Sequence, residues 1–489
     1  MRRPPCRMTA APHRTLPAPA PMKPTLSIQF LAAALLAVLS VPALSDTVRF
    51  ASFNASLNRD STGQLLDDLA LPKLVDSSRA WPDVSGLSVQ QRRVLQAHHA
   101  AEIMQKVRAD VLLINEFDFD RDGVATADSA PTPLGYASAA AHLFHDNFLA
   151  VPHGGADTGR PGSEPLRYAY RYTPNTNTGV PSGLDLDNNA SVGGGGDALA
   201  FGSFAGQFGF TVYSRFEIVN VRSFQNFLWK DMPGNLLLND PTPAPNNLTA
   251  FYSPAKREVL RLSSKNHVDV SLRINGQVVH FIVAHPTPPV FDGPEDRNGK
   301  RNHDEIRLLR DYIHGASYLV DDAGQRGGLA AGAMFVLAGD FNADLCDGES
   351  YRAPCTAAGR AGPGPNAIGQ LLLDGLINTS VTPRSAGGTA AAADPDNNGT
   401  ANQAQRGDPA FDTADFNDAS PGNLRVDYVL PSANLKILAA GVFWPTPLDS
   451  DFALVGSFNK PNLYAGFASS DHRAVWVDVR VPVPPLAKP

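Results

Sequence analysis

The stretch AMFVLAGDFNAD, residues 333–344, decides the fold class of this chain. It begins as the short apolar run Ala333–Ala338 and ends in Gly339-Asp340-Phe341-Asn342, where polar side chains replace the apolar ones. A short apolar run is typical of a strand buried on both faces. Because α/β folds place their functional groups at the carboxyl ends of such strands, the stretch predicts an α/β domain with a site beside Asp340 and Asn342.

Similar runs recur along the chain. We expect strands at Thr47–Ser56, Asp110–Phe117, Gly209–Val219, Val268–Ile274, Gln277–His285, Arg425–Leu430, Leu435–Phe443 and Arg473–Val481. Apolar residues on one face predict helices at Gln90–Arg108 and Asn302–Tyr318, with Asn302 as the amino-terminal cap. Asn275-Gly276 predicts a two-residue hairpin turn. No repeat is visible, so we predict one α/β domain of two mixed sheets over residues 46–485, with long loops at 120–205 and 345–423. We expect residues 380–423 to form a surface insertion.

The amino terminus has the pattern of a secretory signal peptide. A basic start at Met22-Lys23 precedes the apolar run Phe30–Leu39, and small residues lead to Ser45-Asp46. A membrane anchor is the alternative, but the apolar run is short for a bilayer. We therefore expect a secreted or periplasmic protein, cleaved between Ser45 and Asp46 after an upstream extension and a signal peptide at residues 1–45.

Removal of this segment changes the composition. The 489 residues include 41 basic and 48 acidic side chains, a formal charge of −7. The chain from Asp46 keeps 36 basic and 48 acidic residues, a charge of −12, which argues against an extended nucleic-acid-binding surface. Of the three cysteines, Cys346 and Cys355 remain, and in an oxidising compartment a disulfide between them is the natural expectation. Two free thiols are the alternative.

Polar side chains end several of the predicted strands. They are Asn54, Glu116, His285, Asp340, Asn342, Asp427, Asp471 and His472. Each one alone is weak evidence, because a single Asp or Asn after a strand is more often a turn residue. Glu116 is more telling, since a carboxylate after the apolar residues 112–114 needs a partner such as a metal ion.

The order of these motifs supplies the specificity. SFN (52–54), INE (114–116), AHP (284–286), GDFN (339–342), VDYVLP (426–431) and SDHRAV (470–475) follow one another along the chain. In this order they resemble the endonuclease/exonuclease/phosphatase superfamily. The resemblance implies the deoxyribonuclease I-like fold, a four-layer α/β sandwich in which two mixed sheets pack face to face and helices flank them.

The resemblance also implies a role for each residue. Glu116 would bind a divalent metal, Mg²⁺ or Mn²⁺, with Asn54 and Asp471 completing its ligands. Asp340 would orient or deprotonate the attacking water, and Asn342 would hold that water and a phosphate oxygen. The implied reaction is in-line attack of water on phosphorus.

Three histidine and carboxylate roles complete this implied site. His472 would contact the phosphate with Asp427 as its carboxylate partner, which favours the imidazolium form. His285 would lie near the scissile phosphate. Many relatives carry an acid or amide where this chain has Ser56, so we expect one principal metal.

Further candidates come from position alone. Hairpin pairing places Asn266 opposite His285, where it would contact substrate, whereas Lys265 and His267 would need a bulge to do so. Three basic side chains, Arg297, Arg301 and His303, lie near a predicted helix start and would bind phosphate there, although a solvated polar loop explains them equally well.

Two segments contain the first half of an EF-hand loop. They are residues 118–123 and 394–399, and Ser129 and Gln405 stand where the closing glutamate belongs. An irregular Ca²⁺ loop remains an alternative to an Asp/Asn-rich turn.

The sequence thus predicts an exported, metal-dependent phosphoesterase that acts on a phosphodiester or phosphomonoester. We expect a monomer without stable membrane insertion. A secreted nuclease is the second enzymatic hypothesis. A non-catalytic binding protein on the same fold is the hypothesis of another class.

Overall fold

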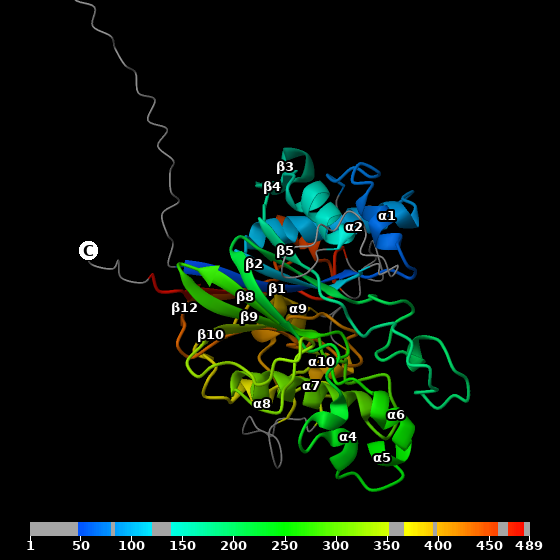
Figure 1. Cartoon of the computed structure of the whole chain (residues 1–489). Helices are drawn as coiled ribbons and strands as arrows, with labels where there is room; N and C mark the ends of the chain where they lie inside the picture. Colours follow the sequence, from blue (N-terminus) through cyan, green and yellow to red (C-terminus); the bar gives the residue numbers. More distant parts are fainter. Residues whose placement is uncertain are drawn as a thin grey trace, which may run out of the picture. The chain divides into compact units, whose positions relative to one another are not determined.

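Strand β1 (Thr47–Leu57) lies inside a six-stranded sheet of the computed structural model (Figure 1). The strand order is β12 (Lys436–Phe443), β13 (Ala474–Arg480), β1, β2 (Val111–Phe117), β6 (Phe210–Ser214) and β5 (Tyr170–Tyr172). Strands β1 and β2 are parallel and the remaining pairs are antiparallel, so the sheet is mixed. The structure describes residues 47–79, 84–119, 138–351, 366–394, 399–457 and 468–483.

A second, five-stranded sheet carries the stretch around Asp340. Its order is β11 (Asp427–Pro431), β10 (Met334–Asp340), β9 (Gln277–Ala284), β8 (His267–Ile274) and β7 (Glu217–Ser223). Strands β9 and β10 are parallel and the others antiparallel. The predicted hairpin is confirmed: Ile274 pairs with Gln277, and Asn275 and Gly276 have φ angles of 51° and 79°, as a primed turn requires.

The two sheets pack face to face, and β10 shows how. Its residues Val336 and Ala338 belong to the core between the sheets, where Phe50 of β1 and Phe281 of β9 meet with ring centroids 5.5 Å apart. The intervening Leu337 belongs instead to a second core, because alternate residues of a strand point to opposite faces. Both faces of β10 are therefore buried, which explains its uninterrupted apolar sequence.

Helices cover the outer faces of the two sheets. The second core joins β10 to α7 (Arg297–Ile313), whose apolar residues at 306, 308 and 309 are buried in it. Helix α2 (Val89–Val107) packs on the six-stranded sheet with Val94, Leu95 and Ile103 in the first core. Two mixed sheets flanked by helices confirm the predicted fold class.

Shorter elements occupy the connections. They are α1 (Gln64–Leu69), α3 (Ala139–Phe144), β3 (His153–Gly155), β4 (Arg160–Ser163), α4 (Leu236–Asn239), α5 (Leu248–Phe251), α6 (Pro254–Val259), α8 (Gly369–Leu372), α9 (Ala386–Ala393) and α10 (Thr400–Gln403). Among the helices of the described ranges, none combines the length and the apolar character needed to cross a bilayer.

Two predictions of secondary structure were wrong. The run Gly209–Val219 is not one strand but contains the whole of β6 and the start of β7, which lie in different sheets. The chain turns between them, where the Phe216 backbone N–H donates to Ser214 Oγ. Helix α7 begins at Arg297 rather than at Asn302, because Asn302 does not cap it: its amide donates to the carbonyl groups of Thr287 and Phe341.

Candidate active site

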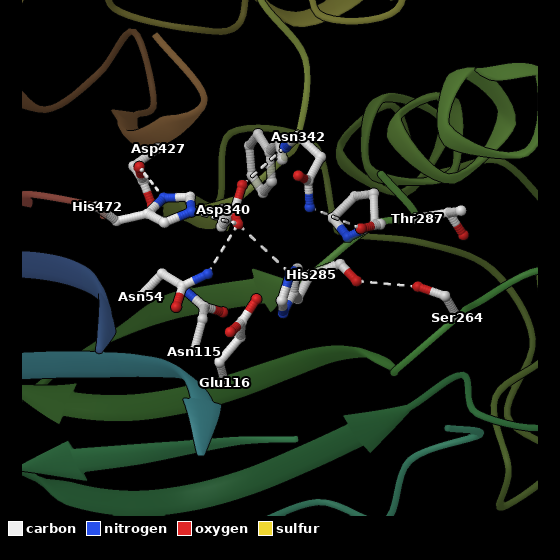
Figure 2. A network of polar contacts seen from close by, with 12 residues as sticks. Asn54, Asn115, Glu116, Ser264, His285, Thr287, Asp340, Asn342, Asp427 and His472 are labelled. Carbon is white, nitrogen blue, oxygen red and sulfur yellow. Dashed lines mark hydrogen bonds and ion pairs between the residues drawn. The ribbon is translucent and has the colours of Figure 1, made fainter. Parts of the chain in front are cut away.

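The polar residues that end the strands gather at one edge of the sandwich. Figure 2 shows Asn54, Glu116, His285, Asp340, Asn342, Asp427 and His472 around a common centre. They come from the ends of β1, β2, β9 and β10, from the start of β11 and from the segment before β13. The parallel pairs β1–β2 and β9–β10 explain this, because the carboxyl ends of parallel strands meet at the same edge.

Asp340 lies at the centre of the cluster and is 1% exposed. Its Oδ2 accepts a hydrogen bond of 3.0 Å from Asn54 Nδ2 and lies 3.4 Å from His285 Nε2 and 3.7 Å from His472 Nε2 (Figure 2). Burial alone would raise the pKa of Asp340, but the charge of His472 and the hydrogen bond from His285 outweigh it. The pKa is held below its ordinary value, so the carboxylate is ionised at neutral pH.

His472 and Asp427 form a buried pair beside Asp340. His472 Nδ1 lies 2.8 Å from Asp427 Oδ2. Asp427 stands opposite Asp340 in the register of the antiparallel strands β10 and β11. Burial opposes the charge on His472, yet the carboxylates of Asp427 and Asp340 raise its pKa well above the ordinary value. Burial also raises the pKa of Asp427, to about 7, against the opposing effect of His472. For this coupled pair we assign the shared proton to the imidazole, because two carboxylates stabilise it there and one hydrogen bond fixes its orientation.

His285 is the electrostatic opposite of His472. Burial, together with the charge of Lys265, lowers its pKa to about 4, so the imidazole is neutral at pH 7. Its Nδ1 is buried and has no hydrogen-bond partner among the described residues. The cluster thus contains one cationic and one neutral imidazole facing the same carboxylate.

Glu116 and Asp471 are the partly exposed acids of the cluster. Asn58 Nδ2 donates to Glu116 Oε2 at 2.6 Å, and Ser56 Oγ donates to Asp471 Oδ1 at 3.2 Å. Burial and then the negative charge of Asp471 raise the pKa of Glu116. A carboxylate whose charge is disfavoured by burial and by a second carboxylate is what a divalent cation would stabilise.

Three residues in or beside the site have a strained backbone conformation. Ser56, Glu116 and Asn342 have φ angles of 48°, 53° and 51°, in the left-handed region that non-glycine residues seldom adopt. At Ser56 the register between β1 and β2 shifts, and the Ser56 backbone N–H donates to Asn54 Oδ1. Such strain costs about 1–3 kcal/mol per residue and persists where surrounding structure holds it, commonly at functional sites.

The donor set fits a divalent metal. Carboxylate and amide oxygens of Glu116, Asp471 and Asn54 are hard ligands that suit Mg²⁺ or Mn²⁺. The buried Oδ1 of the neighbouring Asn115 has no partner among the described residues. Ligand atoms of Asp340, Asp427 and His472 also lie within 4.8 Å of one another. We do not assign the metal there, because His472 Nδ1 is engaged by Asp427 and the ring is protonated.

The segment around Thr413 holds the His472–Asp427 pair in place. Thr413 Oγ1 accepts the Asp427 backbone N–H at 2.9 Å, and the Thr413 carbonyl accepts the N–H of Arg473 at 2.7 Å. Asp415 forms a fully buried ion pair of 3.0 Å with Arg473. The insertion at 380–423, predicted to lie on the surface, therefore reaches the centre of the site, and Phe416 packs edge to face on the His472 ring at 5.3 Å.

The residues predicted from position alone do not join the cluster. Asn266 donates to the Asn175 carbonyl and to Ser223 Oγ. Arg301 donates to main-chain carbonyls, including those of Leu262 and Leu199. The other two, Arg297 and His303, contact Glu295 and Asp304, their near neighbours in the sequence. Each side chain has a hydrogen-bond partner within the protein, and its contact with a phosphate stays a prediction.

Sequence reasoning missed several side chains that the structure brings to the cluster. Asn58 and Ser470 contact the two exposed acids, and Thr413 and Phe416 contact the histidine pair. Asn58 lies four residues after Asn54, but the shift at Ser56 that positions it has no sequence signal. Lys265 carries a charge that acts on His285, and only its place before β8 hinted at this.

Two further predictions fall largely outside the described residues. Cys355 lies there, so the disulfide with Cys346 remains a prediction. Much of both EF-hand-like segments lies there too, and the same holds for a Ca²⁺ site in them. A separate acidic group, Asp185, Asp187 and Asp197, has ligand atoms within 4.8 Å of one another, but many of these oxygens accept backbone N–H groups of their own loop.

Comparisons with known proteins identify one family. The family model described as "Endonuclease/Exonuclease/phosphatase family" matches residues 84–472. Similar solved structures include an endonuclease/exonuclease/phosphatase from Beutenbergia cavernae, with 16% identity, a TM-score of 0.40, and 89% of this chain and 72% of that chain covered. Sphingomyelinase C from Streptomyces griseocarneus has 16% identity, a TM-score of 0.36, and coverages of 88% and 99%. Mannosyl-6-phosphatase from Bacteroides thetaiotaomicron has 11% identity, a TM-score of 0.38, and coverages of 88% and 99%. No curated protein matches the chain.

Proposed function

The chain belongs to the endonuclease/exonuclease/phosphatase family, and we propose that it is a divalent-metal-dependent phosphoesterase that hydrolyses a phosphodiester or a phosphomonoester. Members of this family are mostly hydrolases that act on phosphoesters. The observation that carries the proposal is that a cationic His472 and a neutral His285 both lie within 3.7 Å of Asp340 Oδ2. Two partly exposed acids lie beside them.

Asp340 and Asn342 would position the attacking water. The Asp340 carboxylate is ionised, and Asn342 is held next to it because its backbone N–H donates to Asp340 Oδ1 at 2.9 Å. The Asn342 amide donates to the Pro286 carbonyl, which leaves its oxygen as a second acceptor for that water. The water would attack phosphorus in line and give a proton to Asp340, the P–O ester bond would break, and the departing alkoxide would take up a proton from solvent in place of the one that the water released.

His472 would stabilise the charge that develops on the phosphate. Its Nδ1 is bound to Asp427, so Nε2 is the free donor, and it faces the same space as Asp340 Oδ2. A protonated imidazole fixed in this way donates a charge-assisted hydrogen bond to a phosphate oxygen without reorganisation. Neutral His285 is available to take up or deliver a proton on the other side of Asp340.

Glu116, Asp471 and Asn54 would hold the metal. A bound Mg²⁺ or Mn²⁺ supplies Lewis-acid polarisation and neutralises charge on the phosphate oxygens. Asn58 keeps Glu116 in place, and Ser56 does the same for Asp471. This chain offers Ser56 where a second acidic ligand would stand, so we propose one principal metal site.

We further propose that the mature enzyme is exported after cleavage between Ser45 and Asp46. Its sequence pattern supports this, and amino-terminal sequencing of the protein recovered from outside the cytoplasm would test it. A mature chain beginning within residues 1–40 would contradict the proposed cleavage. A nuclease is the weaker alternative, because a formal charge of −12 gives no extended basic surface.

A substrate panel tests the proposed activity. Purified protein is assayed with a phosphomonoester, a phosphodiester, sphingomyelin and DNA while Mg²⁺ or Mn²⁺ is titrated. We expect hydrolysis that EDTA abolishes and excess metal restores. The variants D340N and H472A should lose at least ~10²–10³-fold in kcat while circular dichroism shows both to be folded at the assay temperature. An intact protein inactive across the panel would favour the binding-protein hypothesis.

A further inference from the structure

Lys265 is a buried cation without an internal counter-charge in contact. Its residue is 6% exposed, and it lies two positions before β8, just outside the β8–β9 ladder that begins with His267 and Ala284. Within the described ranges no acceptor lies within hydrogen-bond or ion-pair distance of its ammonium group. An unpaired buried ammonium costs free energy, so a folded chain keeps one mainly where a ligand supplies the missing anion.

The surrounding contacts fix where Lys265 lies. Ser264, its neighbour, donates from Oγ to the His285 carbonyl at 3.0 Å, which ties the segment to the end of β9 (Figure 2). The Lys265 carbonyl accepts the Asn177 N–H at 3.0 Å. The segment is thus anchored on both sides, one residue away from the carbonyl of an active-site histidine.

Two of the three carboxylates whose charges act on Lys265 belong to the active-site cluster. Its charge interacts with Glu305, Glu116 and Asp340, and these do not prevent burial from lowering its pKa. Glu305 is already used, because its two oxygens accept the backbone N–H groups of Ser264 and Thr287. The remaining two acids belong to the active-site cluster. The ammonium therefore belongs electrostatically to the space that the proposed substrate would occupy.

Lys300 shows what a structural buried lysine looks like in this protein. It is 1% exposed, and its Nζ donates to Asp240 Oδ2 at 2.8 Å and to the Glu295 carbonyl at 2.7 Å. Lys265 has no such partners, although it is buried to a similar degree. The contrast separates a lysine whose ammonium group is bound within the protein from one whose ammonium group has no acceptor among the described residues.

We propose that the ammonium group of Lys265 binds a non-bridging oxygen of the substrate phosphate and favours a phosphomonoester dianion over a phosphodiester. This inference rests on the proposed function. A phosphomonoester carries up to two negative charges at neutral pH, because its second pKa is about 6, whereas a diester carries one. Each added charge gains from a fixed cation in a low-dielectric site, so the dianion gains more.

The test compares two charge states of the ligand in three variants. K265M removes the charge and keeps the apolar stem, K265R keeps the charge, and K230M at a surface lysine is the matched control. Binding of inorganic phosphate and of dimethyl phosphate is measured by calorimetry in the presence of Mg²⁺, independently of turnover. Values of kcat/KM are measured for p-nitrophenyl phosphate and bis(p-nitrophenyl) phosphate.

We expect K265M to weaken the binding of inorganic phosphate at least ~10-fold and that of dimethyl phosphate less than ~3-fold. K265R should recover part of the lost affinity for inorganic phosphate. The kcat/KM ratio of monoester to diester should fall by a similar factor. The unfolding midpoint of K265M should stay equal or rise, since an unpaired buried charge is removed; a structural role predicts the opposite.

The possible results separate the inference from the proposed function. Hydrolysis by the wild type with unchanged phosphate affinity in K265M would overturn the inference and leave the function standing. Phosphate binding that depends on Lys265, without hydrolysis of any substrate, would overturn the proposed function and leave the inference standing. Equal losses for both ligands would overturn the selectivity.

Discussion

Replacement of Asp427 by asparagine tests the central electrostatic argument. Asp427 is fully buried, and its Oδ2 lies 2.8 Å from His472 Nδ1. The substitution keeps the volume and one hydrogen-bonding oxygen but removes the charge that favours the imidazolium. At an effective dielectric constant of about 20, two unit charges whose centres lie about 4 Å apart interact by roughly 4 kcal/mol, and we take about 3–4 kcal/mol as the loss because the amide dipole replaces part of it. Each 1.36 kcal/mol corresponds to a tenfold change in rate, so kcat should fall by ~10²–10³-fold.

The assay is steady-state hydrolysis of the best substrate of the panel, at saturating metal, together with urea unfolding. Asp478 provides the matched control. It lies on β13, the strand that follows His472, and forms an ion pair with Arg49 of β1, so D478N should leave kcat unchanged. The unfolding midpoint of D427N should lie close to that of the wild type. Activity within threefold of the wild type would refute the assignment of His472 as a cation held by Asp427.

Three further predictions concern other parts of the chain. D415A leaves the buried Arg473 guanidinium without its ion pair, so the free energy of unfolding in urea should fall by about 3–5 kcal/mol; a loss below 1 kcal/mol would contradict the importance of this pair. Burial, followed by the charge of Asp292, raises the pKa of Asp296 to about 7, so ionisation of this carboxyl group should destabilise the fold increasingly as pH rises from 4 to 7. The free energy of unfolding of D296N should equal that of the wild type at pH 4 and exceed it by ~1–2 kcal/mol at pH 8 after allowance for solvent screening, and a difference that does not change with pH would disprove this. E116Q should raise the Mg²⁺ concentration for half-maximal binding by at least ~10-fold in calorimetry, and an unchanged value would place the metal elsewhere.

Much of the fold was predictable, because apolar runs and strand ends are local properties. The run before Asp340 predicted β10, and Asn275-Gly276 predicted the β8–β9 hairpin with its register. The apolar run at 209–219 was wrongly predicted as one strand, because hydrophobicity does not show that the chain leaves one sheet for the other at Arg215. Local pattern gives the elements, and long-range packing decides their partners.

The candidate site was predictable only in part, for a related reason. Residues that end strands, such as Asp340 and Glu116, were identifiable from the sequence. Thr413 was not, because its contacts with Asp427 and Arg473 depend on how the insertion folds, and the hairpin pairing had placed Lys265 away from the site. The left-handed backbone at Ser56 is likewise a consequence of tertiary contacts and has no sequence signal.

The position of Thr413 has a consequence for how the protein loses activity on heating. Asp427 belongs to the five-stranded sheet, and His472 leads into the six-stranded one, so their 2.8 Å contact spans the two sheets. Thr413 bonds to the main chain on both sides of that contact. Release of residues 408–424 alone would therefore separate the pair while both sheets stay folded, and inactivation would precede global unfolding. The stability of this insertion, rather than that of the two sheets, would then limit activity on heating.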